Sequence, residues 1–112
     1  MPQTASDGSL DAALTALADA NRRAILAALR AGPTPVGQLA GELGLSQQVT
    51  SHHLGVLRRA GLVSGSRDGT RHLFVVDTDG LAAVRSYLDE FWPSHLAALK
   101  AAVEGRQEAS DG

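Results

Sequence analysis

The feature that most constrains the fold is one segment, Ser46–Ala60, in which apolar spacing and both helix ends agree. Thr50, Leu54 and Leu57 recur at intervals of four and three residues, which places them on one face of a helix, with Val49, His53 and Ala60 beside them. The serine that opens the segment is a suitable N-cap, because its hydroxyl can accept a hydrogen bond from a free amide of the first turn. Gly61 can adopt the left-handed conformation that often ends a helix. The sequence therefore predicts a helix with one buried face and a polar first turn.

A shorter helix is predicted just upstream, over Val36–Leu43, with Gly44 as its stop. Thr34 or Pro35 stands at its start, and proline is favoured in the first turn of a helix. Two helices joined by so tight a turn form either a helical hairpin or a helix-turn-helix, whose second helix enters the major groove of DNA. Glycine-containing turns occur in both, so the spacing alone leaves both interpretations open.

An extended run follows the second predicted helix. It begins at Leu62, turns at Asp68-Gly69, and returns as Arg71–Val76, which is rich in β-branched and aromatic residues. A β-hairpin directly after such a helix, with arginine at its tip, is typical of a winged helix-turn-helix, although ordinary surface hairpins also carry charge. The predicted fold is mainly α with a small β-hairpin: a winged helix-turn-helix of about five helices in one domain.

Three runs carry a family resemblance: ALADANRRAILAALRAG at 16–32, VGQLAGELGLSQQVTSHHLGVLRRAGLV at 36–63, and GTRHLF at 69–74. Together they resemble the ArsR-type winged helix-turn-helix transcriptional repressors, in particular members that lack the cysteine metal site. The resemblance covers roughly residues 10–103, and it implies a sequence-specific homodimeric repressor that binds an inverted-repeat operator. Where relatives often have proline and then threonine-valine, this chain has Gln48, Val49 and Thr50. Because these residues lie at the start of the predicted second helix, the departure affects which bases the protein is expected to prefer and not the expected fold.

The resemblance and the side-chain chemistry together predict which residues contact DNA. Glutamine amides can pair bidentately with adenine, so the predicted base contacts lie at the start of the second helix: Gln47, Gln48, Ser51 and His52. The predicted phosphate or wing contacts are Ser46, Arg58, Arg67, Thr70, Arg71 and His72. Arg22 and Arg23 are weaker candidates, with a salt bridge to Asp19 as the alternative.

The distribution of charge supports a DNA partner although the net charge is −2. Residues 22–75 carry seven arginines against Glu42 and Asp68, a local net charge of +5, whereas both flanking segments are acidic. The local field, rather than the total charge, neutralises phosphates and releases counterions. The middle of the chain is therefore expected to face DNA.

Apolar stripes near both ends of the chain predict a dimer interface. The second stripe continues at heptad-like spacing over residues 81–103, which is too long for the core of one small domain. In the family that the chain resembles, the first and last helices pair two subunits; the alternative is a last helix folded back on its own subunit. The predicted interface residues are Leu10, Leu14, Leu81, Val84, Leu88, Phe91, Trp92, Leu96 and Leu99. Pro93 predicts a kink in this stripe or the start of a new helix.

The titratable residues do not indicate an enzyme, and no cofactor is expected. His52 and His53 are adjacent on the predicted helix and diverge by about 100 degrees, so they cannot easily serve one substrate or one metal. His53 is instead expected to be partly buried and bonded to the backbone. Many relatives bind metals, but this chain has no cysteine, so we expect neither a thiol nor a metal switch. A metal-responsive repressor using His95 with Asp89 and Glu90 is the alternative, and a solvated helix face is the simpler interpretation of these residues.

The sequence also suggests partners and a compartment. The expected partners are double-stranded DNA and a second copy of the chain, with a small apolar ligand or a protein at Phe91-Trp92 as the effector; an interaction adaptor that has lost DNA binding is a further alternative. With no long apolar run and no signal segment, the protein is expected to be cytoplasmic and free of membranes. Residues 1–8 and 105–112 are expected to be mobile tails around a DNA-binding and dimerisation domain at 9–104.

Overall fold

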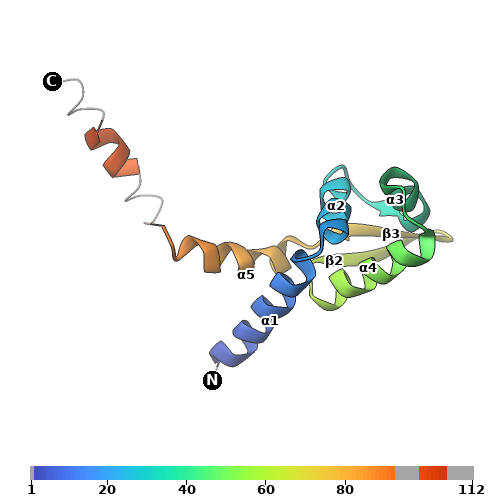
Figure 1. Cartoon of the computed structure of the whole chain (residues 1–112), viewed down its shortest axis with the longest axis horizontal. Coiled ribbons are helices and arrows are strands. Elements are labelled where there is room, and N and C mark those ends of the chain that lie inside the picture. The colour runs from blue at the N-terminus through green and yellow to red at the C-terminus, as the bar shows by residue number, and fades with distance from the viewer. Residues whose placement is uncertain (1, 93–98, 106–112) are drawn as a thin grey trace.

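The computed structural model describes residues 2–92 and 99–105, with side chains from residue 8 onward. Its elements are α1 (Pro2–Leu17), α2 (Ala20–Leu29), β1 (Thr34–Pro35), α3 (Val36–Leu43), α4 (Gln47–Arg59), β2 (Val63–Asp68), β3 (Arg71–Val76) and α5 (Thr78–Asp89) (Figure 1). Residues 99–105 are also helical. Helices α2, α3 and α4 pack with the sheet into one body, and α1 and α5 extend from it toward the same side (Figure 1). The predicted winged helix-turn-helix is confirmed.

The two central helices end as the sequence predicted. Helix α3 stops at Gly44, which has a φ of +67°, and the N–H of Leu45 donates to the carbonyl of Ala40 at 3.0 Å. Helix α4 stops at Gly61, which has a φ of +78° and donates to Arg58 O, while Leu62 donates to Leu57 O. This pair of hydrogen bonds is the Schellman motif, and it satisfies carbonyls that the end of a helix leaves free.

The wing is an antiparallel hairpin in which β2 and β3 pair from Val63↔Val76 to Asp68↔Arg71. The two residues between the strands are Gly69 and Thr70, and only the glycine has a positive φ, as at the first position of a type II′ turn. The sequence did not predict the third strand, β1, which lies against the other edge of β3. At two residues, one of them proline, it is too short to produce a strand pattern.

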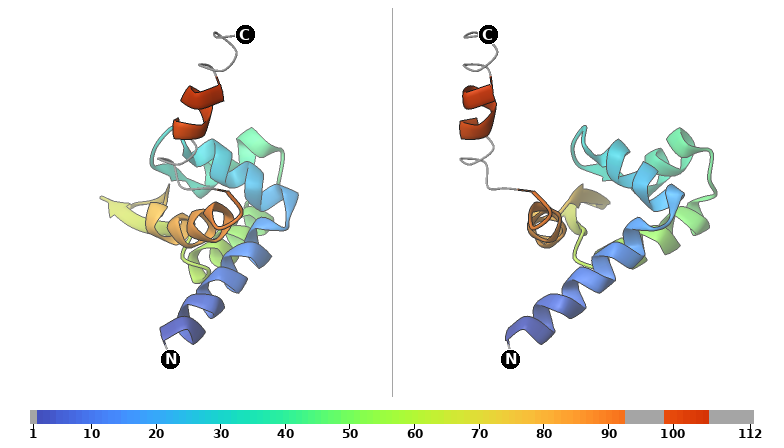
Figure 2. Two further views of the ribbon diagram at one scale, coloured as in Figure 1. Left: turned by 90° about the vertical axis from the view of Figure 1, so that its left-hand side faces the viewer. Right: turned by 60° about the vertical axis from the view of Figure 1, so that its left-hand side comes forward.

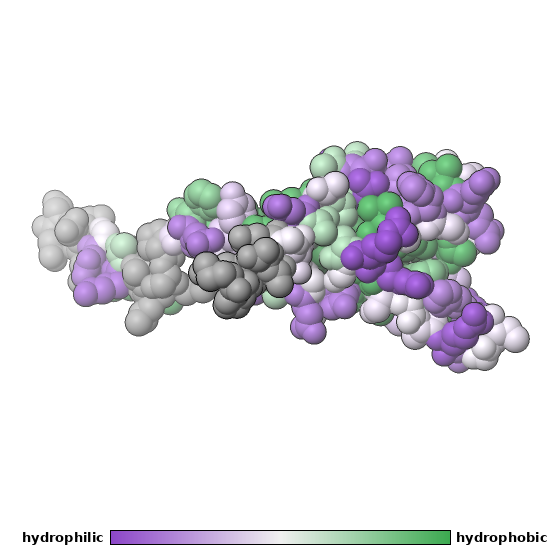
Figure 3. Space-filling model, turned by 90° about the horizontal axis from the view of Figure 1, so that it is seen from below, coloured by the Kyte–Doolittle hydropathy of each residue, from purple (hydrophilic) through white to green (hydrophobic). Residues whose placement is uncertain are grey.

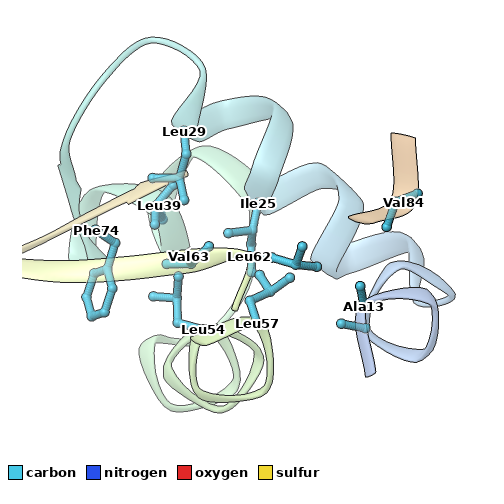
Figure 4. Packing of buried hydrophobic residues seen from close by; sticks show 11 residues of the cluster. Ala13, Ile25, Leu29, Leu39, Leu54, Leu57, Leu62, Val63, Phe74 and Val84 are labelled. Carbon is cyan, nitrogen blue, oxygen red and sulfur yellow. The ribbon is translucent and has the colours of Figure 1, made fainter. Parts of the chain in front are cut away.

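A single apolar cluster joins the elements of the body (Figure 4). Leu54 and Leu57 of α4 point toward Ile25 of α2 and toward Leu62, which follows α4 (Figure 4). The helix therefore buries the face that its apolar spacing predicted and leaves its other face free. Leu39 from α3 and Phe74 from β3 complete the cluster on the side of the wing.

Helix α1 begins at Pro2, well before residue 9, where the predicted domain begins. Proline fits the first turn of a helix, and the small and polar residues after it allow the helix to continue. Residues 2–8, expected as a tail, are thus helical. None of the helices among the described residues is long and apolar enough to cross a membrane.

The apolar stripe at residues 81–103 is divided between two uses. Val84, expected at the dimer interface, is instead buried in the core of its own protomer and lies opposite Ala13 of α1 (Figure 4). Heptad spacing identifies one helix face, but it does not tell which part of that face α1 covers. Leu10 and Leu81 also pack partly against this core, whereas Leu88 and Leu99 are exposed.

The stripe is also not one helix. Helix α5 ends at Asp89. The amides of Glu90, Phe91 and Trp92 each donate to the carbonyl three residues before, so the α-helical pattern of bonds to the fourth residue before is not continued. The break therefore starts before Pro93, which lies outside the described residues together with His95 and Leu96. The Cα radius of gyration is 18.9 Å, against about 13 Å for a compact chain of about 100 residues. The chain is much more extended than a typical isolated domain of its length.

The first turn of α5 meets the end of α4 at direct backbone contact. A Cβ placed on Gly80 would overlap the carbonyl group of Gly61, so only glycine fits this position. The N–H of Asp77 donates to Leu62 O at 2.9 Å beside it. These two contacts attach α5 to the body.

Replacing Gly80 with alanine should lower the free energy of unfolding by about 1–3 kcal/mol, because backbone atoms must move to admit the methyl group. The matched control is Gly41→Ala in α3, where nothing lies within 4 Å of the new Cβ. Alanine there should raise stability by about 0.5–1 kcal/mol through helix propensity. Urea unfolding of both variants measures the difference, and equal midpoints would contradict the close approach.

Candidate nucleic-acid interface

The first turns of α4 present the predicted base-contact residues to solvent. Gln47, Gln48, Ser51 and His52 are all exposed, while Thr50 and Leu54 beside them are buried. The N-terminal end of α4 and the tip of the wing lie at the same end of the molecule, away from the projecting α1 and α5 (Figure 1). Polar side chains at the open end of a firmly packed helix can reach base edges without repacking the core.

The predicted N-cap is present at the start of α4. The hydroxyl oxygen of Ser46 accepts a hydrogen bond from the N–H of Val49 at 3.0 Å. Because the hydroxyl uses only an acceptor position in this bond, its proton remains free to donate to a phosphate oxygen. The helix N-terminus beside it carries partial positive charge, which favours an anion.

Two neighbouring residues of α4 have burial opposite to their polarity. Val49 is 42% exposed, whereas Thr50 is 0% exposed. The hydroxyl of Thr50 donates to the carbonyl of Ser46 at 2.8 Å, so its burial leaves no polar atom unpaired. An apolar side chain therefore stands on the polar first turn, and the sequence interpretation had placed it beside the buried seam.

The outward face of α4 continues to an arginine that sequence reasoning did not select. Gln48, His52 and Arg59 follow one another at intervals of four and seven, so they share the face opposite the buried leucines. The guanidinium of Arg59 lies back over Gly55, with Nη1 3.3 Å from the position of a Cβ on that glycine. The interval of seven residues from His52 to Arg59 was the available signal in the sequence. The sequence prediction instead selected Arg58, the neighbour of Arg59.

The wing carries its arginines in the open and its histidine against the sheet. Arg67, Arg71 and Thr70 are exposed at the tip. His72 is half-buried: its ring lies over Gly65 on the paired strand, and its centroid is 4.5 Å from that of Phe74. The structure therefore places His72 in the packing of the wing as well as at its surface.

Arg22 and Arg23, the weaker candidates for DNA contact, turn toward α1. Arg22 Nε donates to Ala16 O at 2.7 Å, and Arg23 Nη1 donates to Leu17 O at 2.8 Å. Both guanidinium groups therefore satisfy carbonyls at the end of α1. The ion pair to Asp19 that we considered as the alternative is present but long, with Arg22 Nη1 3.9 Å from Asp19 Oδ2. Arg58, Arg59 and the wing arginines Arg67 and Arg71 are exposed and are not engaged in this way with α1.

Asp19 is held by the helix that it caps. Its carboxylate accepts hydrogen bonds from the N–H groups of Arg22 and Asn21 at the start of α2. The bond from the Arg22 backbone lowers the pKa of Asp19 below its usual value, and the Asn21 bond and the Arg22 charge act in the same direction. The aspartate therefore stays ionised and keeps both the cap and the arginine in place.

His53 differs from its neighbour. It is buried on the core side of α4 and lies against Arg22 rather than bonding to the backbone as expected. Within the described part of the chain, no group of three or more His, Asp or Glu side chains is arranged to hold a metal ion. The histidine of the alternative metal site, His95, lies outside that part.

Helices α3 and α4, with the wing behind them, define a winged helix-turn-helix DNA-binding domain, and comparisons with known proteins agree. A family model described as a helix-turn-helix domain matches residues 17–65. The HTH-type transcriptional regulator Rv2034 of Mycobacterium tuberculosis is 48% identical over 88 residues, which cover 79% of this chain and 82% of that protein.

Solved structures extend the similarity over the fold. An ArsR-like transcriptional regulator from Rhodococcus sp. RHA1 matches with a TM-score of 0.70 at 27% identity, covering 88% of this chain and 95% of that one. A homodimeric winged helix-turn-helix DNA-binding domain from Mycobacterium bovis matches with a TM-score of 0.67 at 29% identity, covering 80% and 86%. The chain belongs to the ArsR-type winged helix-turn-helix transcriptional regulators, a family of DNA-binding proteins rather than enzymes.

Proposed function

We propose that this regulator is a homodimeric repressor that acts in the cytoplasm and inserts α4 of each subunit into the major groove of an inverted-repeat operator. The observation that carries the proposal is the exposed polar start of α4 on a helix whose other face is fully buried. Half-sites separated by about 10 base pairs, or a multiple of that, would face the same side of the duplex.

Each class of side chain has a distinct task in this complex. The amides of Gln47 and Gln48 contact base edges, adenine being the best match, and Ser51 and His52 add hydrogen bonds beside them. The phosphates are contacted by cationic and hydroxyl groups around this surface, namely Ser46, Arg58, Arg59, Arg67, Thr70 and Arg71. His72 contributes mainly by holding the strands of the wing together.

Selection of random duplex DNA on the purified full-length protein tests the proposal and yields the operator. A palindromic consensus supports it. Recovery of no sequence above background would instead favour the alternative, an interaction adaptor on a fold that no longer binds DNA.

Substitutions of α4 and of the wing should affect binding in different ways. Gln47→Ala should cost about 1–3 kcal/mol on the operator and relax base preference at one or two positions of each half-site, with little effect on random DNA. Arg67→Ala and Arg71→Ala should weaken all sequences similarly and reduce the salt dependence by about one unit per lost contact. Fluorescence anisotropy over a range of salt concentrations measures both effects.

Arg85→Ala is the control for the loss of one positive charge, because Arg85 is exposed on α5, away from the proposed DNA surface. Its ion pair, from Nε to Asp89 Oδ2, is long at 4.0 Å. The substitution should leave both affinity and salt slope nearly unchanged. Equal losses on operator and random DNA for Gln47→Ala would remove its role in base recognition.

Val49 should contact the methyl group of a thymine, because an exposed apolar side chain on the first turn of α4 matches the one apolar group in the major groove. Replacing single thymines of the operator with deoxyuridine removes that methyl group and nothing else. The wild-type protein should lose affinity at one position of each half-site, by about 1 kcal/mol for each methyl group.

Val49→Ala should bind the thymine and deoxyuridine operators equally well. Unequal binding by this variant, or equal binding by the wild-type protein at every position, would show that Val49 touches no thymine methyl group. Each comparison uses one folded protein on two duplexes, so altered stability cannot imitate the result.

Dimerisation through the projecting elements explains why these elements expose large hydrophobic side chains in the isolated chain. Phe91 and Trp92 are 65% and 64% exposed, and Leu14, Leu88 and Leu99 are exposed as well. Hydrophobic surface is visible on the projecting part of the molecule in Figure 3. A second copy would cover this surface, and the related domain from Mycobacterium bovis is homodimeric.

Replacing both Phe91 and Trp92 with glutamate should convert the dimer to a monomer at micromolar concentration, because buried aromatic residues often contribute about 2 kcal/mol or more each to an interface. The protomer should stay folded, since both side chains are largely exposed within it. Light scattering gives the mass, and Arg30→Glu on α2 is the control for added negative charge. A dimeric double variant would place the interface elsewhere.

Repression should be independent of thiols and of stoichiometric metal. The chain has no cysteine, and three of its four histidines (His52, His53 and His72) lie in the DNA-binding region, where a bound metal would compete with DNA. Zinc, nickel and cobalt titrated against the operator complex should therefore leave it intact. Release at stoichiometric metal that is lost in His95→Ala would establish the alternative, a site built from His95 with Asp89 or Glu90. A small apolar ligand or a protein that binds at Phe91-Trp92 remains our proposed class of effector.

A further inference from the structure

The guanidinium group of Arg22 joins three helices. Its Nε and Nη2 donate to Ala16 O at 2.7 Å and to Thr15 O at 3.3 Å, both at the end of α1. Its Nη1 lies 3.4 Å from Nδ1 of His53 on α4. Arg22 itself stands on α2, with its side chain only 14% exposed.

We propose that Arg22 and His53 are positioning residues, which hold the recognition helix α4 at a fixed orientation to α1 and so set the half-site separation that the dimer prefers. The inference rests on the proposed function, in which α1 and α5 form the dimer and α4 contacts the operator. Neither residue is proposed to touch DNA.

The chemistry of the pair makes the contact directional. Arginine has donors only, so the hydrogen bond forms when His53 Nδ1 is the acceptor and the imidazole proton resides on Nε2. The guanidinium is planar and two of its nitrogens are already engaged by α1, so the direction of the third nitrogen is fixed. The imidazole can meet it only in a narrow range of α4 orientations.

The Arg22–His53 contact connects the helix proposed to bind DNA, α4, with the elements proposed to form the dimer, α1 and α5. His53 is followed by the buried Leu54 and preceded by the exposed His52, whose ring centroid is 5.7 Å from that of His53. At the other end, α1 carries the exposed Leu14 and packs against α5 through Ala13 and Val84 (Figure 4). A rotation of α4 relative to α1 would break the Arg22–His53 contact first, because a polar contact depends on angle more steeply than apolar packing does.

The views of Figure 2 show the path through the fold. The long α1 runs from the N-terminus up to the start of α2, and α4 lies beyond this junction. The Arg22 side chain therefore acts where the projecting part of the molecule joins the body. In a symmetric dimer the contact occurs twice, so a small change of angle in each subunit alters the separation of the two recognition helices twice over.

The test compares His53→Leu, which removes the acceptor, with His53→Asn, whose amide oxygen can take the place of Nδ1. Each full-length protein is measured on the selected operator, on operators with one base pair added or removed between the half-sites, and on random DNA. For His53→Leu we expect about tenfold weaker binding to the operator, unchanged binding to random DNA, and less discrimination among the three spacings. His53→Asn should restore operator affinity and spacing preference to within about threefold of the wild-type values.

Arg22→Lys provides a second variant that does not alter α4. Lysine keeps the charge but cannot reach two carbonyls of α1 and His53 in one planar arrangement, so it should also lose spacing discrimination. A merely structural role would lower the unfolding temperature of these variants without changing the ratio of operator to random binding. Wild-type spacing discrimination in either His53→Leu or Arg22→Lys would overturn the inference, and so would a His53→Asn variant as weak as His53→Leu.

The outcomes also separate this inference from the proposed function. If the wild-type protein selects no DNA sequence, the proposed function itself fails. If the wild-type protein selects an operator and the variants keep its spacing preference, only the role of the Arg22–His53 contact fails.

Discussion

The burial of two leucines of α4 is the interaction on which the rest of the structure depends. Leu54 and Leu57 are 1% and 0% exposed, and burying a leucine contributes about 1.5–3 kcal/mol. Because α4 has only one apolar face, this burial also decides which side chains remain outside. Gln48, His52 and Arg59 lie opposite the leucines and therefore face solvent. The contact that stabilises the domain thus also orients the surface proposed to bind DNA, and the two properties cannot vary independently.

The helix ends show how the chain arranges several helices within so short a length. One free amide at the start of α4, that of Val49, is satisfied by the Ser46 hydroxyl, and free carbonyls at the end of α4 are satisfied by the Schellman bonds of Gly61 and Leu62. The end of α1 is satisfied instead by arginine side chains from α2. Hydrogen bonds from neighbouring backbone groups end a helix locally, whereas the arginine side chains also attach α1 to α2. The difference explains why these two arginines are engaged within the fold, at the end of α1.

Most of the body could be predicted from the sequence because its signals are local. Ser46, Gly44, Gly61 and the wing turn each act within a few residues, and the apolar spacing of α4 gave its buried face. The features that could not be predicted depend on distant neighbours. The roles of Arg22 and Arg23 follow from the position of α1, and the burial of Val84 follows from how far α1 covers α5. Val49 was placed beside the seam because it is apolar, but it is 42% exposed, whereas Thr50 is buried in the seam as its spacing predicted.

The contact between Gly80 and the Gly61 carbonyl has a mechanical consequence. Most helices meet through side chains, which can change rotamer and absorb a small displacement of one helix before the other responds. At Gly80 there is no side chain on either partner, and the backbone of α5 rests on the backbone that terminates α4. A displacement of the start of α5 toward the body must therefore be taken up by the last turn of α4 itself. The junction acts as a rigid linkage in compression, so any molecule that pushes α5 inward works directly on α4, the helix proposed to enter the DNA groove.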